Sequence, residues 1–398
     1  MKIFFHDFGD YPLFFSFTAE LARRHEHVTH AYVELLSVDR SGSLAVSEPC
    51  YEVKRLQMPG DYQAVKYSFF KRFNLEARYA RVAATAVVEA EPDLVLSANA
   101  PTHVQSALQQ AARESGARFI CWTQDFYCEA VRSILHKKFG PLGGLIGNVF
   151  HFWERRQIRQ CDGVLVITEG FRQQLHEWGY PDDQVEVMAN WAPIESLPVL
   201  AQENDWSREH GLVGKFCFLY SGTMGLKHNP ELLLQCAERY ARDPSVRIVV
   251  VAEGTGADYL REQLTRPELN GCLIVLPMQA AARVPEVLAT ASVLIATLEP
   301  EASHICVPSK VLTYLCAARP LLLSVADKNL AAETVRTGQA GFTAAPDRAD
   351  LFMSAADRLR QDEALCRELG ANARRYAEAS FQIERIVDQF ERFMGRVL

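Results

Sequence analysis

Hydrophobic and polar positions alternate along this chain in a regular way. Short apolar runs recur throughout, and between them apolar residues repeat at the three- and four-residue spacing of amphipathic helices. Strands that alternate with helices predict an α/β protein with parallel sheets. The clearest strands are expected at 2–6, 93–98, 118–122, 163–168 and 184–188 in the first half, and at 215–220, 246–252, 272–276, 293–297 and 320–324 in the second.

The alternation stops between residues 191 and 214, where WAPIESLPVLAQENDWSREHGLVG is rich in proline and polar residues. We interpret this stretch as the connection between two Rossmann-like halves, and a length of 398 residues supports two domains. We expect a first domain over 1–195, a linker over 196–214 and a second domain over 215–380. The last helical stretch, 381–398, follows the second sheet and is expected to pack back on the first domain.

Composition narrows the class of protein. A hydrophobic content of 48% and a charged content of 23% fit a globular protein, and a net charge of -7 argues against a dedicated nucleic-acid binder. Ten cysteines show no C-x-x-C pair and mostly lie in apolar runs, which favours a reducing compartment. The N-terminus lacks a long apolar core, and the run 139–153 is too short to span a bilayer. We therefore expect a cytoplasmic protein.

The stretch YSGTMGLKHNPELLLQCAERY, 220–240, ends a strand with a glycine loop and then opens a helix. Asn229 is a good N-cap and Pro230 suits the first helical position. Glycines let backbone N–H groups approach an anion, and the helix dipole favours negative charge there. The loop therefore indicates a phosphate site at Gly222, Lys227 and His228. A plain strand-to-helix turn with Lys227 on the surface is the alternative.

A second loop lies in EPEASHICVPSKVLTYLCAARPLLLS, 299–324. Ser309 can cap a helix over 310–318, and Lys310 then sits on its first turn, where the dipole disfavours a cation. An anionic ligand would remove that conflict, whereas the alternative is that Lys310 points into solvent. A third loop, AEGTGADYL at 252–260, is a glycine turn after a strand, but it lacks the G-x-G-x-x-G spacing of a dinucleotide fingerprint.

Four segments carry a family resemblance: FLYSGTMGLKHNPELLL, VVVAEGTGADYLREQL, LPMQAAARVPEVLATASVLIATL and VPSKVLTYLCAARPLLLS. In this order and spacing they resemble the donor domain of retaining family-4 glycosyltransferases with the GT-B fold. The most similar group is that of bacterial exopolysaccharide and O-antigen enzymes, which includes colanic acid and fucosamine transferases. In the first half, NWAPIESLP resembles that group's inter-domain crossover, and Thr123–Gln124–Asp125 resembles its strand-end Gln-Asp.

The resemblance implies two Rossmann-like domains that face a central cleft. It implies that the second domain holds a nucleotide-diphosphate sugar, and that the first holds a glycan or polyprenyl-diphosphate-linked acceptor. The implied donor-binding residues are Gly222, Thr223, Lys227, His228, Gly254, Met278, Gln279, Pro308, Ser309, Lys310 and Thr313. The implied acceptor-binding residues are Gly9, Asp10, Gln124 and Asp125. Catalytic roles fall to Asp125, Lys227 and Lys310, and neither a cofactor nor a metal is expected.

The sequence also departs from the family pattern. Many family-4 enzymes carry two glutamates eight positions apart, and those positions are Ile305 and Thr313 here. Glu299 and Glu301 do not restore the spacing, and the usual arginine of the first donor loop is Thr223. We expect Ser309, Lys310 and Lys227 to compensate.

Asp125 follows an apolar strand, so its carboxylate could orient or deprotonate an acceptor hydroxyl. A turn or N-cap aspartate is the alternative for Asp125, and equally for Asp10 after Gly9. Two basic and aromatic stretches, 66–82 and 131–156, suit a surface that touches anionic lipid, with ordinary amphipathic helices as the alternative. The protein is thus expected to lie peripherally on the inner face of the plasma membrane.

The function predicted from the sequence is sugar transfer from a nucleotide donor in bacterial surface polysaccharide biosynthesis. Two alternatives stay open. A non-hydrolysing sugar-nucleotide epimerase shares the architecture, but it would need clustered acidic and histidine groups that the pattern does not show. A non-catalytic nucleotide- or glycan-binding relative is the other, because the glutamate pair is absent.

Overall fold

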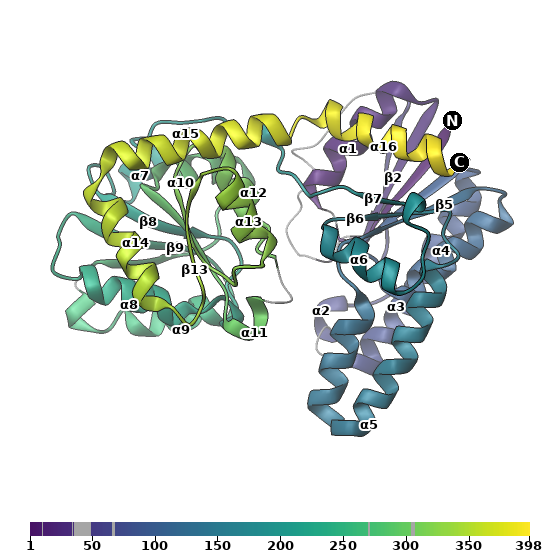
Figure 1. Cartoon of the computed structure of the whole chain (residues 1–398), viewed down its shortest axis with the longest axis horizontal. Helices are drawn as coiled ribbons and strands as arrows, with labels where there is room; N and C mark the ends of the chain where they lie inside the picture. Colours follow the sequence, from purple (N-terminus) through teal and green to yellow (C-terminus); the bar gives the residue numbers. More distant parts are fainter. Residues whose placement is uncertain (10, 34, 36–48, 66–67, 270, 304–306) are drawn as a thin grey trace. The chain divides into compact units, whose positions relative to one another are not determined.

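The computed structural model describes residues 1–9, 11–33, 35, 49–65, 68–269, 271–303 and 307–398. The chain forms two compact units (Figure 1). The first comprises Met1–Asn190 together with Ile383–Leu398, and the second comprises Trp191–Gln382.

A seven-stranded sheet forms the centre of the first unit, with the order β3-β2-β1-β4-β5-β6-β7 and parallel pairing throughout. Its strands are β1 (Lys2–Asp7), β2 (His27–Val33), β3 (Tyr51–Leu56), β4 (Leu94–Ala98), β5 (Arg118–Thr123), β6 (Gly163–Val166) and β7 (Val185–Val187). The helices are α1 (Pro12–Arg24), α2 (Tyr62–Val65), α3 (Phe69–Ala90), α4 (Thr102–Glu114), α5 (Tyr127–Ile158), α6 (Glu169–Glu177) and α16 (Ile383–Val397).

The second unit has a six-stranded parallel sheet with the order β10-β9-β8-β11-β12-β13. Its strands are β8 (Phe216–Ser221), β9 (Val246–Val251), β10 (Leu273–Leu276), β11 (Val293–Thr297), β12 (Leu321–Ser324) and β13 (Gly341–Ala344). The helices are α7 (Asp205–Glu209), α8 (Pro230–Tyr240), α9 (Thr255–Gln263), α10 (Val284–Thr290), α11 (Pro300–Ser303), α12 (Lys310–Cys316), α13 (Leu330–Thr337), α14 (Ala349–Gln361) and α15 (Glu363–Ser380). Both sheets are doubly wound, which confirms the predicted fold class.

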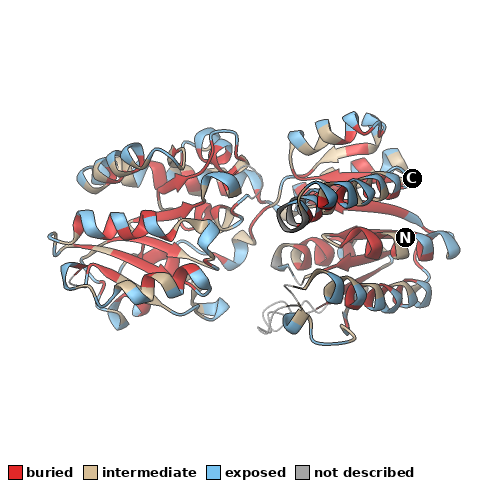
Figure 2. Cartoon of the chain, turned by 90° about the horizontal axis from the view of Figure 1, so that it is seen from below, coloured by how far each residue is buried: buried red, intermediate tan, exposed pale blue. Residues whose placement is uncertain are grey.

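The apolar runs of the sequence become strands because helices cover both faces of each sheet. In Figure 2 the strands are buried and the exposed surface lies on the outer sides of the helices. The central strands β4, β11 and β12 are buried at every position. Parallel strands that are covered on both faces need continuous apolar runs, and for this reason the sequence pattern predicted these strands.

Three strands were not predicted. β2 has the sequence HVTHAYV, whose histidines and threonine hide its burial, and β3 has the sequence YEVKRL, which is half-exposed at a sheet edge. β13, GFTA, is a short edge strand. Edge strands lack the continuous apolar run of a central strand, so the pattern does not reveal them.

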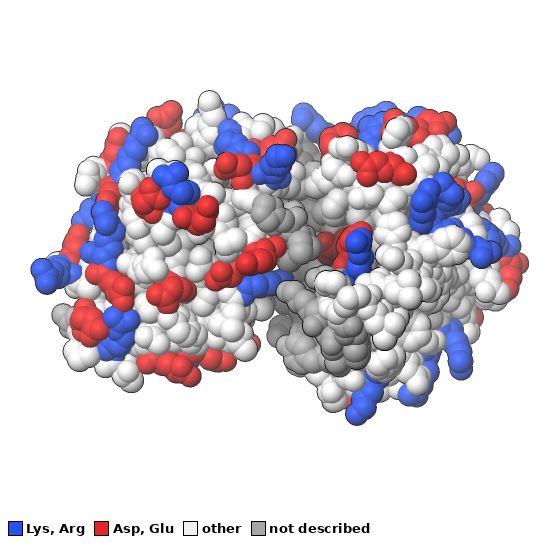
Figure 3. Space-filling model, turned by 60° about the horizontal axis from the view of Figure 1, so that its bottom comes forward, with Lys and Arg blue, Asp and Glu red and all other residues white. Residues whose placement is uncertain are grey.

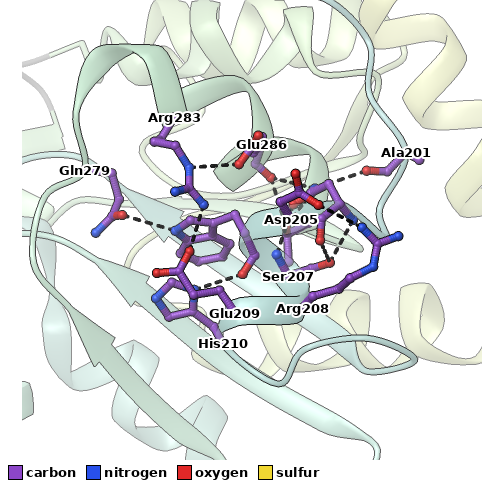
Figure 4. A network of polar contacts seen from close by, with 12 residues as sticks. Ala201, Asp205, Ser207, Arg208, Glu209, His210, Gln279, Arg283 and Glu286 are labelled. Atoms are coloured by element: carbon purple, nitrogen blue, oxygen red, sulfur yellow. Dashed lines mark hydrogen bonds and ion pairs between the residues drawn. The ribbon is translucent and has the colours of Figure 1, made fainter.

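The structure places the predicted linker, 196–214, within the second unit. This unit begins at Trp191 rather than at 215. Trp206 in α7 is fully buried, and its indole N–H donates to the side-chain oxygen of Gln279 over 3.2 Å. Arg283 joins Glu209 of α7 to Glu286 of α10, as Figure 4 shows. The proline-rich composition concealed a packed segment.

The C-terminal helix α16 packs on the first unit rather than on the sheet that precedes it. The rings of Phe390 and Phe17 have centroids 5.3 Å apart in an edge-on contact. Arg24 of α1 donates to Asp388 over 2.6 Å and to Glu391 over 2.9 Å. Figure 1 shows α16 beside α1, with both chain termini on this unit.

Helix α5 is a helical hairpin rather than one rod. Gly140 has non-helical dihedral angles (φ 57, ψ -138) and Pro141 follows it, so two arms meet there. A Cβ atom at Gly143 would lie 1.9 Å from the carbonyl oxygen of Leu135, and one at Gly147 would lie 2.9 Å from Arg132 Cα. The glycines of the GGLIG stretch therefore let the arms touch. Among the described helices, none is both long and apolar enough to cross a membrane.

Candidate functional site

The strand order of the second sheet reverses between β8 and β11. Doubly wound sheets bind ligands beyond the carboxyl ends of their strands at such a reversal. The loop 222–229 follows β8, and the stretch that begins at 298 and contains α11 follows β11, so both predicted phosphate segments begin at this point.

The loop after β8 is built by glycine geometry and by two caps. Gly222 has a φ of +119, which only glycine adopts without strain. The N–H of Gly225 donates to His228 Nδ1 over 2.9 Å. Asn229 caps α8 by accepting from the N–H of Leu232 over 3.2 Å, and Pro230 occupies the first turn. The predicted helix start at Asn229 and Pro230 is confirmed.

Lys310 reaches back into this loop. Its Nζ atom lies 3.6 Å from the centroid of the Tyr220 ring and donates to the carbonyl oxygen of Thr223 over 3.3 Å. A Cβ atom at Gly222 would lie 3.5 Å from the same Nζ. Lys310 thus joins the two loops, and the alternative that its side chain points into solvent is wrong.

The electrostatics of the loop favour an anion. Burial lowers the pKa of Lys310 well below its ordinary value, and nearby Lys227 lowers it further. Burial, Lys310 and Lys227 together lower the pKa of His228 to about 4. His228 is therefore neutral at pH 7, with Nδ1 accepting from Gly225 and the proton on Nε2. Among the described residues, no carboxylate pairs with Lys310, so an anionic ligand would relieve its unfavourable charge.

The start of α12 differs from the prediction. Ser309 has helical dihedral angles (φ -55, ψ -25) and its side chain does not cap the helix. The helix ends at Cys316 rather than at 318. Tyr314 anchors it instead, because its hydroxyl accepts from the N–H of Ser221 over 2.8 Å and donates to the Ser221 carbonyl over 3.0 Å. Pro308 is buried and Thr313 is half-buried.

The loop after β9 lies directly against the loop after β8. Gly254 has a φ of +114, and a Cβ atom there would lie 2.6 Å from the carbonyl oxygen of Met224. The N–H of Gly256 donates to that same carbonyl over 2.9 Å, and the N–H of Met224 donates to the Glu253 carbonyl over 2.8 Å. Gly254 therefore shapes the site by allowing two backbones to touch.

The loop after β10 contains the other two predicted donor residues. Met278 is exposed. The Gln279 amide is held at both ends, since its oxygen accepts from Trp206 and its nitrogen donates to the Pro277 carbonyl over 2.9 Å. Figure 4 shows Gln279 turned toward the α7 network. Its side chain thus supports the fold of the second unit.

The described residues among those predicted for the first unit, Gly9, Gln124 and Asp125, lie at the carboxyl edge of its sheet. Gly9 follows β1 with a φ of +152, and a Cβ atom there would lie 2.7 Å from Tyr11 Cε2. Gln124 follows β5 and exchanges two amide hydrogen bonds with Asn190, over 3.2 and 2.7 Å. Asp125 is exposed, and Asp10 lies outside the described residues, as does Ile305.

Buried Glu154 fixes the loop that carries Asp125. Its two carboxylate oxygens accept from the N–H groups of Tyr127, over 3.0 Å, and Cys128, over 2.7 Å, at the start of α5. Sequence reasoning missed this residue, and it also missed Tyr220 and Tyr314. Only the position of Tyr220, two residues before the loop glycine, offered a signal.

One group of side chains has the geometry of a metal site. Ligand atoms of Cys128, Glu129 and His151 lie within 4.8 Å of one another. Burial and the neighbouring Glu154 raise the pKa of the Cys128 thiol far above its ordinary value. A thiol binds metal as the thiolate, so this environment disfavours a metal. That the activity of this protein needs no metal stays a prediction.

Comparison with known proteins agrees with this fold. Residues 16–191 match the family described as Glycosyl transferase 4-like domain, and residues 215–362 match Glycosyl transferases group 1. The two matches together cover most of the chain, and the chain belongs to the glycosyltransferases built from these two domains. The resemblance identified in the sequence is confirmed.

One similar curated protein is the "Putative colanic acid biosynthesis glycosyl transferase WcaI" of Escherichia coli. It is 22% identical over 228 residues, which is 56% of this chain and 55% of the relative. The match therefore spans about half the length of that relative.

Solved structures share the fold over the whole chain. Anabaena HepE in complex with UDP-glucose has a TM-score of 0.70 at 15% identity, covering 99% of each chain. Sucrose-phosphate synthase from Thermosynechococcus elongatus has a TM-score of 0.74 at 15% identity, covering 100% of this chain and 99% of the other. At these identities the likeness shows the GT-B fold.

Proposed function

We propose that the protein transfers a sugar from a nucleotide-diphosphate sugar to a glycan or lipid-linked acceptor in bacterial surface polysaccharide biosynthesis. The single observation that carries this proposal is the position of Lys310. A half-buried lysine is held beside a glycine loop at the strand reversal, and its pKa is well below its ordinary value. The relatives support the sugar chemistry, because one is a putative colanic acid transferase and another was solved with UDP-glucose.

The donor diphosphate would bind at the loops after β8 and β11. Negative charge grows on the leaving diphosphate as the glycosidic bond breaks, and fixed cations stabilise a transition state of this kind. Lys227 and Lys310 would supply that charge, and the backbone at Gly222 and Thr223 would approach the phosphates closely. No metal is needed for this step, and we propose that configuration at the sugar is retained, as in the family.

Residues of the first unit would bind the acceptor. Asp125 presents an exposed carboxylate on a loop that Glu154 holds in place. A carboxylate in such a position can accept a hydrogen bond from a sugar hydroxyl and orient it. Gly9 and Gln124, at the same sheet edge, would complete this site.

The α5 hairpin supports a location on the inner face of the plasma membrane. Its exposed apolar side chains are spaced so that they share one helix face; they are Leu142, Leu145, Ile146, Val149 and Phe152. Residues 130–153 contain no Asp or Glu but include Arg132, Lys137 and Lys138. Figure 3 shows a broad area of uncharged side chains on the first unit, with basic side chains along part of its border. An exposed apolar face on a stretch that contains basic residues and no carboxylates suits an anionic bilayer surface.

A thermal-shift panel of UDP-, GDP- and dTDP-sugars tests the donor assignment. A ligand that binds only the folded protein raises its melting temperature. We expect one nucleotide class to raise it, and release of the matching nucleotide diphosphate once an acceptor is added. An epimerised sugar nucleotide formed without acceptor would instead indicate an epimerase. No stabilisation by any member of the panel would contradict the proposal.

A further inference from the structure

The two arms of the α5 hairpin form a groove between them. Its volume is about 560 Å³, which is in the size range of small-molecule sites. Residues three and four apart lie on one face of a helix, so each arm presents one face to the groove. The lining residues include Glu129, Arg132 and His136 on the first arm and Gly144, Leu145 and Asn148 on the second.

Glycines of the second arm keep this groove open and set how the arms face each other. A Cβ atom at Gly147 would lie 2.9 Å from Arg132 Cα, so the arms touch at this level. A Cβ atom at Gly144 would lie 3.5 Å from His136 Nδ1, so the imidazole ring lies against a position that has no side chain. Arg132 and His136 therefore stand beside the second arm with their polar groups at the groove.

The polar groups of the groove are accessible and suit an anion. Arg132, His136 and Asn148 are exposed, and their guanidinium, imidazole and amide groups all donate hydrogen bonds. Glu129 is the one carboxylate among the described residues that line the groove, and it lies at the end nearest the start of α5. Hydrogen bonds from an arginine are strongest to carboxylate and phosphate oxygens, so the Arg132 end favours such a group.

The second arm continues from the groove into an apolar surface. Leu145 lines the groove and is also 64% exposed. Leu142 and Val149, which are 65% and 63% exposed, lie on the same helix face by their spacing. A ligand with an anionic head and a hydrocarbon chain could therefore bind its head at Arg132 and lay its chain on this face.

The groove begins close to the loop that carries Asp125. Helix α5 starts at Tyr127, and Arg132 follows five residues later, about 7 Å along the helix axis. Figure 1 shows α5 extending away from the sheet of the first unit. Along the hairpin the chain thus presents first the carboxylate of Asp125, then the donors of the groove, and then the apolar face. A lipid-linked sugar has the same order of parts: hydroxyl groups, diphosphate and hydrocarbon chain.

We propose that this groove binds the diphosphate of a lipid-linked acceptor, with Arg132, His136 and Asn148 on the phosphate oxygens and Leu145 against the first part of the hydrocarbon chain. The proposal rests on the proposed function, because it names the residues that recognise the lipid part of the acceptor of that reaction. It goes beyond contact with an anionic bilayer, since a groove that leads to Asp125 selects a head group that carries a sugar.

Calorimetric titration of farnesyl diphosphate into the full chain tests the groove. Farnesol and inorganic diphosphate each carry one part of this probe. We expect farnesyl diphosphate to bind at least about tenfold more tightly than either part, and the Arg132→Gln, His136→Gln variant to bind it about tenfold more weakly than the wild type does. The control variant, Arg113→Gln with His176→Gln, changes the same residue types at exposed positions outside the hairpin and should bind as the wild type does.

A second measurement uses the wild type alone. A geranyl diphosphate that carries a benzophenone group is irradiated with the protein, and we expect mass spectrometry to find the cross-link within α5. The proposal is overturned if inorganic diphosphate or dihexanoyl phosphatidylglycerol binds as tightly as farnesyl diphosphate, if the hairpin variant binds as the wild type does, or if no cross-link falls within α5. Binding of nucleotide sugars is measured separately, so its failure would count against the proposed function alone.

Discussion

Lys310 Nζ lies over the ring of Tyr220, 3.6 Å from its centroid, and joins the end of β8 to the start of α12. Replacing Lys310 with methionine keeps the contact with the ring but removes a half-buried charge. We expect donor affinity to fall at least about tenfold, because a charge-assisted contact to phosphate is lost. The melting temperature without ligand should stay level or rise, since burial disfavours the charged lysine.

Lys215→Met is the matched control for Lys310→Met. Lys215 directly precedes β8 at the opposite end of the strand, where its Nζ donates to the Pro244 carbonyl over 2.9 Å. Calorimetric titration with the donor and thermal melting of both variants would measure the two effects. Equal donor affinity in the two variants would remove Lys310 from the site.

Gly254→Ala tests the contact between the loops after β8 and β9. The new Cβ atom would lie 2.6 Å from the Met224 carbonyl oxygen, at a φ of +114. We expect the free energy of unfolding to fall by about 2 kcal/mol or more. Gly225→Ala is the control in the same loop, because its φ is -87 and the nearest atom lies 3.9 Å away. Urea denaturation measures the free energy of unfolding of both variants. An equal loss of that free energy in Gly254→Ala and Gly225→Ala would argue against the close contact between the two loops.

Glu76 should make stability depend on pH. Burial raises its pKa from 4.5 to about 7, so the folded protein holds this proton more tightly than the unfolded chain does. The stabilisation that comes from protonated Glu76 is therefore fully present below pH 4.5. As the pH rises to about 7 this stabilisation is lost, and the free energy of unfolding falls by about 3 kcal/mol. Glu76→Gln should lose this slope, whereas exposed Glu114→Gln should keep it. The measurement is the melting temperature of each protein between pH 4.5 and 8. If the melting temperatures of the wild type and of Glu76→Gln change with pH in parallel, the assignment is wrong.

The exposed face of the α5 hairpin should bind anionic bilayers. We expect Leu145→Glu with Val149→Glu to abolish sedimentation with anionic liposomes at low salt, because each change places a negative charge on the apolar face. Val88→Glu on α3 is the control, since Val88 is also an exposed apolar residue but lies outside the hairpin. Wild-type sedimentation that is no greater with anionic than with neutral liposomes would contradict the membrane assignment.

The sequence predicted what is local and missed what depends on distant contacts. Some features depend only on consecutive residues, and the sequence predicted these: the central strands, the cap at Asn229 and the glycine loop after β8. The stretch 196–214 looked like a linker because nothing local shows that Trp206 is buried against the second unit. The pairing of Lys310 with Tyr220 joins residues far apart in the chain. Only the folded sheets bring such residues together.

Equilibrium binding of nucleotide diphosphates tests the central claim most directly. UDP, GDP and dTDP are titrated into the full chain beside their nucleosides, and the best ligand is then titrated into a Lys227→Ala, Lys310→Met variant. We predict that one diphosphate binds at least about tenfold more tightly than its nucleoside, and that the double variant loses this difference. A nucleoside that binds as tightly as its diphosphate, or a double variant that binds as the wild type does, would contradict it.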